Sequence, residues 1–323
     1  MAAPPWPVEA PFWPKDPGLR RGHLPVKFEG KDYLGVVIAP AERAGCRPLV
    51  LVCPNYSGLK GFDIRVCEYL ARLGYVGLAV DYYGGAFPPD RRNKPEGGKE
   101  NPGWNDHFFG AFSGMVSWDH DCGRLRRFLE VWRKAGMNIE WVDKKTRPSA
   151  IGYCFGGICV LEMLRGGLDF AGLCSFHGLL QTGEDPNPGL CGVVRPEVVP
   201  CENKYGKNTT LVIANGTHDH LVPPESIGRF YAEMIPNEID MIFDNYSFAP
   251  HGFALPPGVG EYHERTDRRS TMTMLSLFRE IYPHVPQNCV GRNACGTMIP
   301  EVNLRAVASG GCGDGLRRSC AVM

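Results

Sequence analysis

The chain has 323 residues, of which 43% are hydrophobic and 22% are charged, a composition typical of a globular protein with a substantial core. Lysine plus arginine and aspartate plus glutamate are equal at 35 each, so no net charge favours binding to nucleic acid or to an anionic membrane. No apolar run reaches the roughly 18 residues of a membrane span, and no basic start with an apolar stretch marks a secretory signal, so a cytoplasmic location is expected.

The N-terminal part of the chain changes from an irregular to a regular pattern. Residues 1–23 are rich in proline and tryptophan and are predicted to form an extended arm, followed by one domain over residues 24–283. The long segment 82–118 is rich in proline and glycine and then aromatic, and a loop of this length is expected to be functional or disordered. Apolar patterns predict strands at 33–39, 48–53 and 75–81 and a helix at 62–74.

Strands and helices alternate through the rest of the domain. The patterns predict strands at 149–153, 170–176, 209–215 and 238–243, and helices at 119–136, 155–164, 224–234 and 267–282. This alternation is typical of an α/β protein with a mostly parallel sheet and helices on both faces. Such sheets bind ligands at the carboxyl ends of their strands.

One cysteine lies where a predicted strand turns into a helix. The sequence Gly152-Tyr153-Cys154-Phe155-Gly156 has the form of a nucleophile elbow with cysteine in place of the usual serine. Glycine at both flanking positions leaves room for the neighbouring backbone, and the N-terminus of the following helix favours a thiolate and any oxyanion beside it. On these five residues alone, a glycine-rich turn with an incidental cysteine is an equal alternative.

Two later residues complete the pattern of a catalytic triad. An α/β-hydrolase site needs a nucleophile, an acid and a histidine in that chain order. Asp219 follows the strand at 209–215, and His251 lies in the loop after the strand at 238–243. A histidine within reach of a thiol can take its proton, and a carboxylate on the other ring nitrogen fixes the tautomer.

At this point the motifs "IGYCFGG", "SFHGLL", "DHLVPPE", "HGF" and the late "DRRS" resemble the dienelactone hydrolase family of α/β-hydrolases, over about residues 24–282. The resemblance implies an α/β-hydrolase fold with Cys154 as nucleophile, His251 as general base and Asp219 as the acid that orients it. It implies no cofactor and no metal. The oxyanion hole is expected to use the N–H groups of Phe155 and of Tyr56 in "CPNYSG".

Other polar residues at the same sheet edge compete for these roles. His177 follows a strand but precedes Asp219, so it is interpreted as a pocket wall or a structural histidine. Asp240 and Asp244 are alternative acids that lie too close to the segment of His251. A metal site on His218 and His220 is disfavoured because alternation in an extended loop points the two side chains apart. The 13 cysteines include no CxxC pair and are expected to be reduced thiols.

Two departures from the dienelactone-cleaving members bear on the substrate. By resemblance those members carry a glutamate beside the resting thiol where this chain has Asn55, and two arginines where it has Gly85 and Leu255. Without that arginine clamp a substrate carboxylate has no bidentate partner, so neutral or apolar acyl groups are expected. The pocket is predicted to be lined by Asn55, Trp104, Phe108, Phe112, His177 and Phe253.

Two functions from different classes follow. The first is a hydrolase that cleaves a small ester, lactone or thioester through a thioacyl-enzyme; the alternative is a non-catalytic α/β-hydrolase-fold protein that binds a ligand or a partner. Residues 284–323 have little periodicity and are predicted to form a flexible tail. This tail ends in Cys320-Ala321-Val322-Met323, a C-a-a-X prenylation pattern, and one lipid on Cys320 would give weak membrane association.

Overall fold

The structure, a computed structural model, describes residues 16–42, 46–84, 113–115, 117–118, 120–180, 199, 201–257, 259–285 and 291–299. Its main feature is an eight-stranded sheet in the order β1-β2-β4-β3-β5-β6-β7-β8. The strands β1 and β2 form an antiparallel hairpin, β2 is antiparallel to β4, and every other neighbouring pair is parallel. The strands are β1 (Leu19–Phe28), β2 (Lys31–Pro40), β3 (Leu49–Cys53), β4 (Val76–Ala79), β5 (Ser149–Tyr153), β6 (Gly172–Phe176), β7 (Thr210–His218) and β8 (Met241–Pro250).

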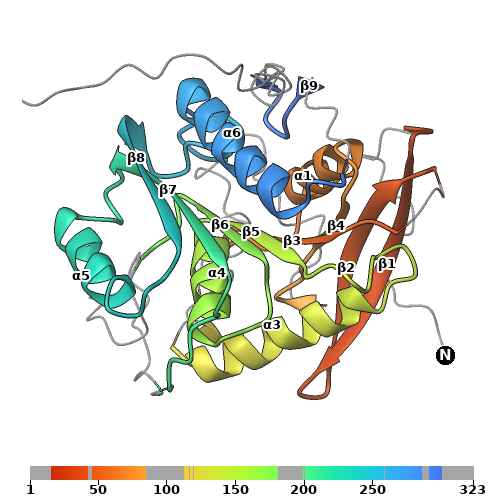
Figure 1. Cartoon of the computed structure of the whole chain (residues 1–323), viewed down its shortest axis with the longest axis horizontal. Helices are drawn as coiled ribbons and strands as arrows, with labels where there is room; N and C mark the ends of the chain where they lie inside the picture. Colours follow the sequence, from red (N-terminus) through yellow and green to blue (C-terminus); the bar gives the residue numbers. More distant parts are fainter. Residues whose placement is uncertain are drawn as a thin grey trace, which may run out of the picture.

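Helices cover both faces of this sheet, as the alternating pattern predicts (Figure 1). Two helices, α1 (Gly61–Arg72) and α6 (Glu264–Ile281), pack on one face, and α3 (Cys122–Met137), α4 (Phe155–Arg165) and α5 (Pro224–Met234) pack on the other. Because successive side chains of a strand point to opposite faces, Leu51 of β3 joins the α3–α4 core and Val52 joins the α1–α6 core. None of the helices in the described ranges is both long and apolar enough to span a bilayer.

The sheet is longer at both edges than the sequence predicts. It begins at Leu19, so the predicted arm boundary at residue 23 lies inside β1, and β8 continues to Pro250 instead of ending at residue 243. Both are edge strands with many partly exposed polar residues, which hides their apolar pattern.

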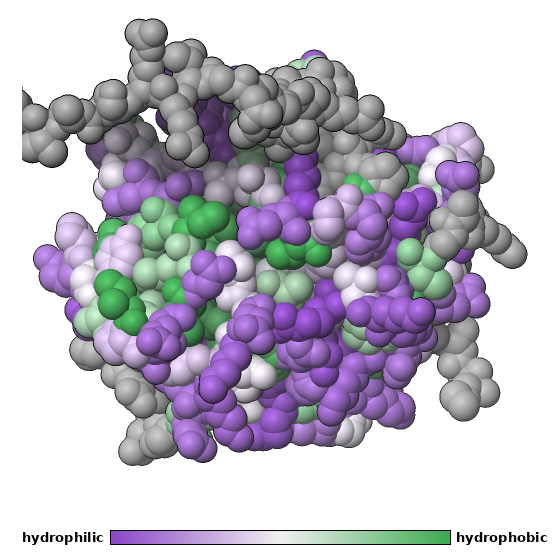
Figure 2. Space-filling view, in the orientation of Figure 1, coloured by the Kyte–Doolittle hydropathy of each residue, from purple (hydrophilic) through white to green (hydrophobic). Residues whose placement is uncertain are grey.

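Apolar side chains also reach the surface over α5 and β8 (Figure 2), among them Ile235, Ile242 and Phe248.

Part of the C-terminal segment lies within the described residues. A short hairpin of β9 (Gly291–Arg292) and β10 (Met298–Ile299) packs on α6, and Ile299 is buried. The side-chain amide of Asn293 donates to Asp267 Oδ2 at 2.8 Å. The prediction of a flexible tail from residue 284 is therefore wrong for this hairpin, because its few apolar and polar side chains find partners on α6 that the sequence pattern does not reveal. Cys320 lies outside the described residues.

Candidate active site

Cys154 lies in a sharp turn between β5 and α4. Its backbone has φ 55° and ψ −113°, a strained conformation for a residue with a side chain. A Cβ atom at Gly152 would lie 2.0 Å from the carbonyl oxygen of Gly156, and one at Gly156 would lie 2.0 Å from that of Cys53. Both flanking positions thus require glycine, and the strand–turn–helix elbow that the sequence predicts is present.

The predicted acid and base lie beside this elbow. Asp219 follows β7 in the chain and His251 follows β8, so both belong to the same end of the sheet as Cys154. The ring nitrogen Nδ1 of His251 is 2.8 Å from Asp219 Oδ2, and the other carboxylate oxygen accepts a hydrogen bond from the Leu221 N–H at 2.9 Å. The side chain of Cys154 is close enough to the imidazole to raise the pKa of His251. The three side chains therefore lie together at this end of the sheet.

The electrostatics of these three residues favour a charged imidazole at His251. Burial disfavours the imidazolium, but the charge of Cys154, the hydrogen bond that the imidazole donates to Asp219 and the interaction with the Cys154 side chain outweigh burial and raise the pKa of His251 to about 10. The carboxylate of Asp219 is fully buried, whereas the side chain of His251 keeps 15% of its exposure. An imidazolium held against the sulfur stabilises the thiolate, which is the nucleophilic form of cysteine.

His177 and Phe253 lie beneath His251 and are fully buried. The ring centroid of His177 is 5.2 Å from that of His251 and 5.1 Å from that of Phe253, in edge-to-face arrangements. Within the described residues neither ring nitrogen of His177 has a hydrogen-bond partner. Burial, and then the charge of His251, lower the pKa of His177 well below its ordinary value. His177 thus packs against both His251 and Phe253, and the contact of His177 and Phe253 with substrate stays a prediction.

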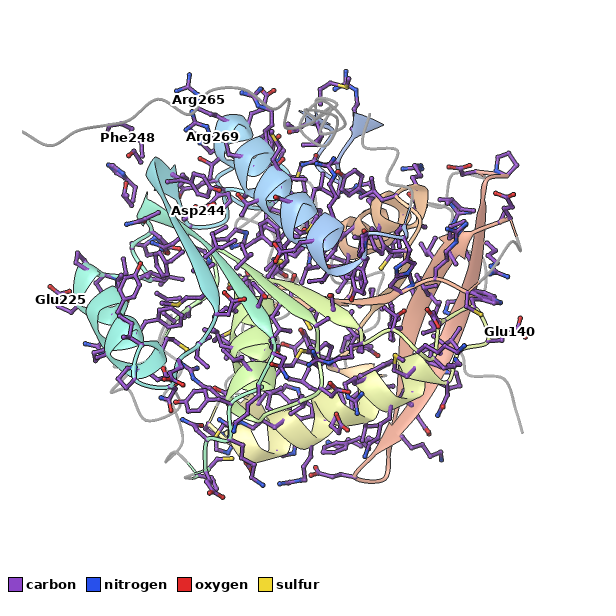
Figure 3. All side chains as sticks on the ribbon, in the orientation of Figure 1. Glu140, Glu225, Asp244, Phe248, Arg265 and Arg269 are labelled. Carbon is purple, nitrogen blue, oxygen red and sulfur yellow. The ribbon has the colours of Figure 1, made fainter. Side chains whose placement is uncertain are left out.

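The rival acids have other partners. The carboxylate of Asp240 accepts a hydrogen bond from the hydroxyl of Thr210 at 2.6 Å. Asp244, labelled in Figure 3 on β8 close to α6, accepts from the hydroxyls of Tyr246 and Thr273, both at 2.8 Å. Both carboxylates are engaged away from His251, which leaves Asp219 as its acid.

The neighbouring histidines are exposed and face different rings. The ring of His218 is 5.5 Å from that of Phe248, and the ring of His220 is 6.1 Å from that of His251. In the part of the chain that the structure describes, no group of three or more His, Cys, Asp or Glu side chains is placed to hold a metal ion.

The loop between β3 and α1 approaches the elbow. A Cβ atom at Gly156 would lie 2.8 Å from the carbonyl oxygen of Pro54, so this loop touches the first turn of α4. Phe155 is the first residue of α4, where N–H groups have no acceptor within the helix. Asn55 is buried, and its Oδ1 accepts hydrogen bonds inside the loop, which gives it a structural role there; its contact with substrate stays a prediction.

Sequence reasoning missed three residues that hold this loop. The phenol of Tyr83 donates to the carbonyl oxygen of Tyr56 at 2.6 Å, that of Tyr82 donates to Pro54 O at 3.4 Å, and the ammonium of Lys60 donates to Asn55 Oδ1 at 2.8 Å. The only signal for the tyrosines was their place directly after a buried strand, and nothing in the local pattern marks Lys60 as buried. Four residues of the predicted site region, Gly85, Trp104, Phe108 and Phe112, lie outside the described residues.

Proteins of known structure share this fold. A dienelactone hydrolase-like promiscuous phosphotriesterase, P91, from metagenomic libraries is 22% identical, with a TM-score of 0.62 over 82% of this chain and 99% of that one. A putative dienelactone hydrolase from Klebsiella pneumoniae is 17% identical, with a TM-score of 0.63 over 81% of this chain and 99% of that one. An uncharacterized Caenorhabditis elegans protein, K02A2.1, is 27% identical over 168 residues, which are 50% of this chain and 96% of that protein.

The chain also matches a known protein family. Residues 34–282, which include the elbow, the whole His–Asp contact and most of the sheet, match the dienelactone hydrolase family. Members of that family are α/β-hydrolases that act on ester bonds, and the mostly parallel sheet agrees with that fold. The chain is therefore a hydrolase of ester bonds and belongs to the dienelactone hydrolase family.

Proposed function

We propose that this hydrolase cleaves a small carboxylic ester, lactone or thioester through Cys154, His251 and Asp219. The observation that carries the proposal is the contact of His251 Nδ1 with Asp219 Oδ2 at 2.8 Å, beside an elbow whose Cys154 side chain raises the pKa of the same imidazole. A non-catalytic binding protein has no use for this arrangement of nucleophile, base and acid.

The reaction has two steps. In the first, the sulfur of Cys154 attacks the acyl carbon, the carbonyl becomes an oxyanion, and His251 gives its proton to the leaving alkoxide or thiolate as the bond to it breaks. In the second, His251 takes a proton from water, whose oxygen attacks the thioacyl carbon and expels the sulfur. The N–H groups of Phe155 and Tyr56 are the proposed donors to the oxyanion in both steps.

The substrate class follows from what the site lacks. Leu255, at one of the two places where the dienelactone-cleaving members are expected to carry an arginine, is an apolar buried residue. We therefore propose a neutral or apolar acyl group, because an anionic one would lose its hydration without gaining a charged partner. The aromatic residues Trp104, Phe108 and Phe112 remain the proposed lining of the acyl pocket.

A screen of neutral esters, lactones and thioesters beside anionic lactones tests this proposal. Wild type should hydrolyse neutral substrates with the higher kcat/KM, and intact mass after rapid acid quench should show one acyl group on Cys154. Cys154→Ala should show neither turnover nor adduct. Binding of these compounds by wild type without turnover or adduct would favour the alternative, a ligand-binding member of the fold.

We further propose that the protein is cytoplasmic and associates weakly with membranes when Cys320 carries a prenyl group. The support is the C-terminal Cys-Ala-Val-Met sequence with Arg317 and Arg318 just upstream. Intact mass of the protein from its native cell is the test, and an unmodified C-terminal Met323 with a free Cys320 thiol would contradict the proposal.

A further inference from the structure

The loop between β3 and α1 contains a buried ion pair that the reaction above does not use. We propose that Lys60 and Asp63 are positioning residues, which hold the turn at residues 55–58 so that the Tyr56 N–H keeps the direction needed in the oxyanion hole. This inference rests on the proposed function and adds how one of its donors is oriented.

The turn fixes the direction of the Tyr56 N–H. The carbonyl oxygen of Asn55 accepts a hydrogen bond from the Gly58 N–H at 2.9 Å, which closes a four-residue turn. The peptide group is planar and trans, so the N–H of Tyr56 points opposite to the Asn55 carbonyl of the same peptide. With that carbonyl directed into the turn, the N–H is directed out of it. Rotation of this one peptide would remove the donor from its place.

The side chain of Asn55 closes the same turn a second time. Its Oδ1 accepts hydrogen bonds from the N–H of Ser57 at 3.2 Å and from the hydroxyl of Ser57 at 2.7 Å. This arrangement is an Asx turn, in which a side-chain oxygen replaces a backbone acceptor. Asn55 thus has a structural role at the position where the resemblance leads us to expect a glutamate in the dienelactone-cleaving members.

Lys60 ties the two ends of the turn together. Its ammonium donates to Asn55 Oδ1 at 2.8 Å, to the carbonyl oxygen of Gly58 at 3.2 Å and to Asp63 Oδ2 at 3.2 Å. The same oxygen of Asp63 accepts from the backbone N–H of Lys60 at 3.0 Å, which anchors the network to the first turn of α1. The lysine and aspartate side chains keep only 2% and 0% of their exposure.

The cost of this burial argues for a role other than stability. Burial raises the pKa of Asp63, even though Lys60 acts in the opposite direction, so the desolvation of the carboxylate exceeds the attraction within the pair. Buried ion pairs of this kind contribute little net stability compared with apolar side chains of the same size. The ion pair fixes the geometry of the loop through hydrogen bonds, which apolar side chains could not make.

Two tyrosines from the segment after β4 also hold this loop. The phenol of Tyr83 donates to the carbonyl oxygen of Tyr56 at 2.6 Å, and that of Tyr82 donates to Pro54 O at 3.4 Å. The peptide groups on both sides of the Asn55–Tyr56 peptide are thereby fixed from the end of β4. The donor-bearing peptide lies between the lysine network and the tyrosine pair.

The double variant Lys60→Met/Asp63→Asn tests the proposal because it removes both charges without changing the net charge. A misplaced oxyanion donor should lower kcat for a neutral ester about 10- to 100-fold with little change in KM. Alkylation of Cys154 by iodoacetamide displaces iodide and forms no oxyanion, so its rate should stay within about 3-fold of wild type. This contrast is one that a general loss of structure would not produce.

The matched control is Arg21→Met/Glu68→Gln. It removes a partly buried ion pair, with N and O atoms 2.8 Å apart, that joins β1 to the same helix α1 and contains no residue of the turn. Both reactions should stay near wild-type rates in this control. If the double variant at 60 and 63 fails to fold, Tyr83→Phe, which removes one hydroxyl that donates to the same loop, should give the same selective loss of kcat at about 10-fold.

Three outcomes separate the possibilities. Hydrolysis that falls while alkylation is unchanged, in either variant, supports the positioning role. Hydrolysis and alkylation that fall together, or hydrolysis that stays at the wild-type rate, would overturn it. A wild-type protein that hydrolyses no ester, or a Cys154→Ala variant that still does, would instead refute the proposed function and is recognised before either variant is made.

Discussion

Two histidines lie in contact at the candidate active site and differ in their partners and in their pKa. The ring centroids of His251 and His177 are 5.2 Å apart, and the first residue follows β8 while the second follows β6. His251 contacts Asp219 and Cys154, and its pKa is raised to about 10. His177 has no partner for either ring nitrogen in the described part of the chain, and its pKa lies well below the ordinary value.

The difference shows what makes a histidine a base in this fold. Burial by itself favours the neutral imidazole, and His177 shows the result. A buried carboxylate and the charge of Cys154 reverse that preference at His251, whose side chain is 15% exposed and whose ring lies beside that of His177. The partners, and not the position at a strand end, make His251 the proposed base.

The largest expected effect comes from removing the ring of His251, compared with replacing the ring of His177. His251→Ala should lower kcat/KM by at least about 10⁴-fold, because the nucleophile loses its base. His177→Phe keeps the ring volume and should change kcat/KM by less than about 10-fold. Ester hydrolysis assays on both purified variants make the comparison, and equal losses would mean that His177 takes part in the chemistry.

Removal of the carboxylate charge should have the next largest effect. Asp219→Asn keeps the shape of the side chain but no longer stabilises the imidazolium or selects its tautomer, so kcat should fall by about 10²- to 10⁴-fold. The loss should be smaller than that of His251→Ala. Steady-state kinetics on the two variants decide the order, and an unchanged kcat would point to another acid.

The pKa difference itself can be measured by NMR titration of the imidazole signals. His251 should titrate near pH 10 in wild type and at a clearly lower pH in Cys154→Ala, because the thiolate charge is lost while burial remains. Since its folded pKa exceeds the unfolded value of 6.5, the stability that His251 contributes is complete below pH 6.5 and is lost as the pH rises toward 10. Identical titrations in the two proteins would exclude the thiolate–imidazolium pair.

The smallest effect concerns stability in acid. The folded pKa of His177 is below its ordinary value of 6.5, so the unfolded chain takes up a proton that the folded chain does not as the pH falls below 6.5. His177→Phe removes this proton uptake. As the pH falls below 6.5, the variant should therefore gain unfolding free energy relative to wild type by up to about 1.4 kcal/mol per pH unit. Denaturant unfolding at several pH values from 7 downward measures it. Parallel pH dependences in the two proteins would show that His177 is already protonated in the folded state.

The strand–turn–helix order and the three residues of the proposed site could be predicted from the sequence. The glycines around Cys154 indicate a turn with no room for side chains. Asp219 and His251 follow strands in the order that an α/β-hydrolase requires. The helix at 224–234 has the bounds of α5 because its apolar spacing and its proline at the start are local signals. Such features depend on residues close together in the chain.

Which polar side chains come into contact depends on the tertiary packing. Asp219 and His251 are brought to 2.8 Å because β7 and β8 are neighbours in the sheet, and β8 extends to Pro250, beyond its apolar pattern. The same holds for Lys60, whose burial against Asn55 depends on how the β3–α1 loop packs. Hydrophobic periodicity reports which face of an element is buried, but hydrogen bonds between distant segments depend on strand order and loop packing, which no local pattern encodes.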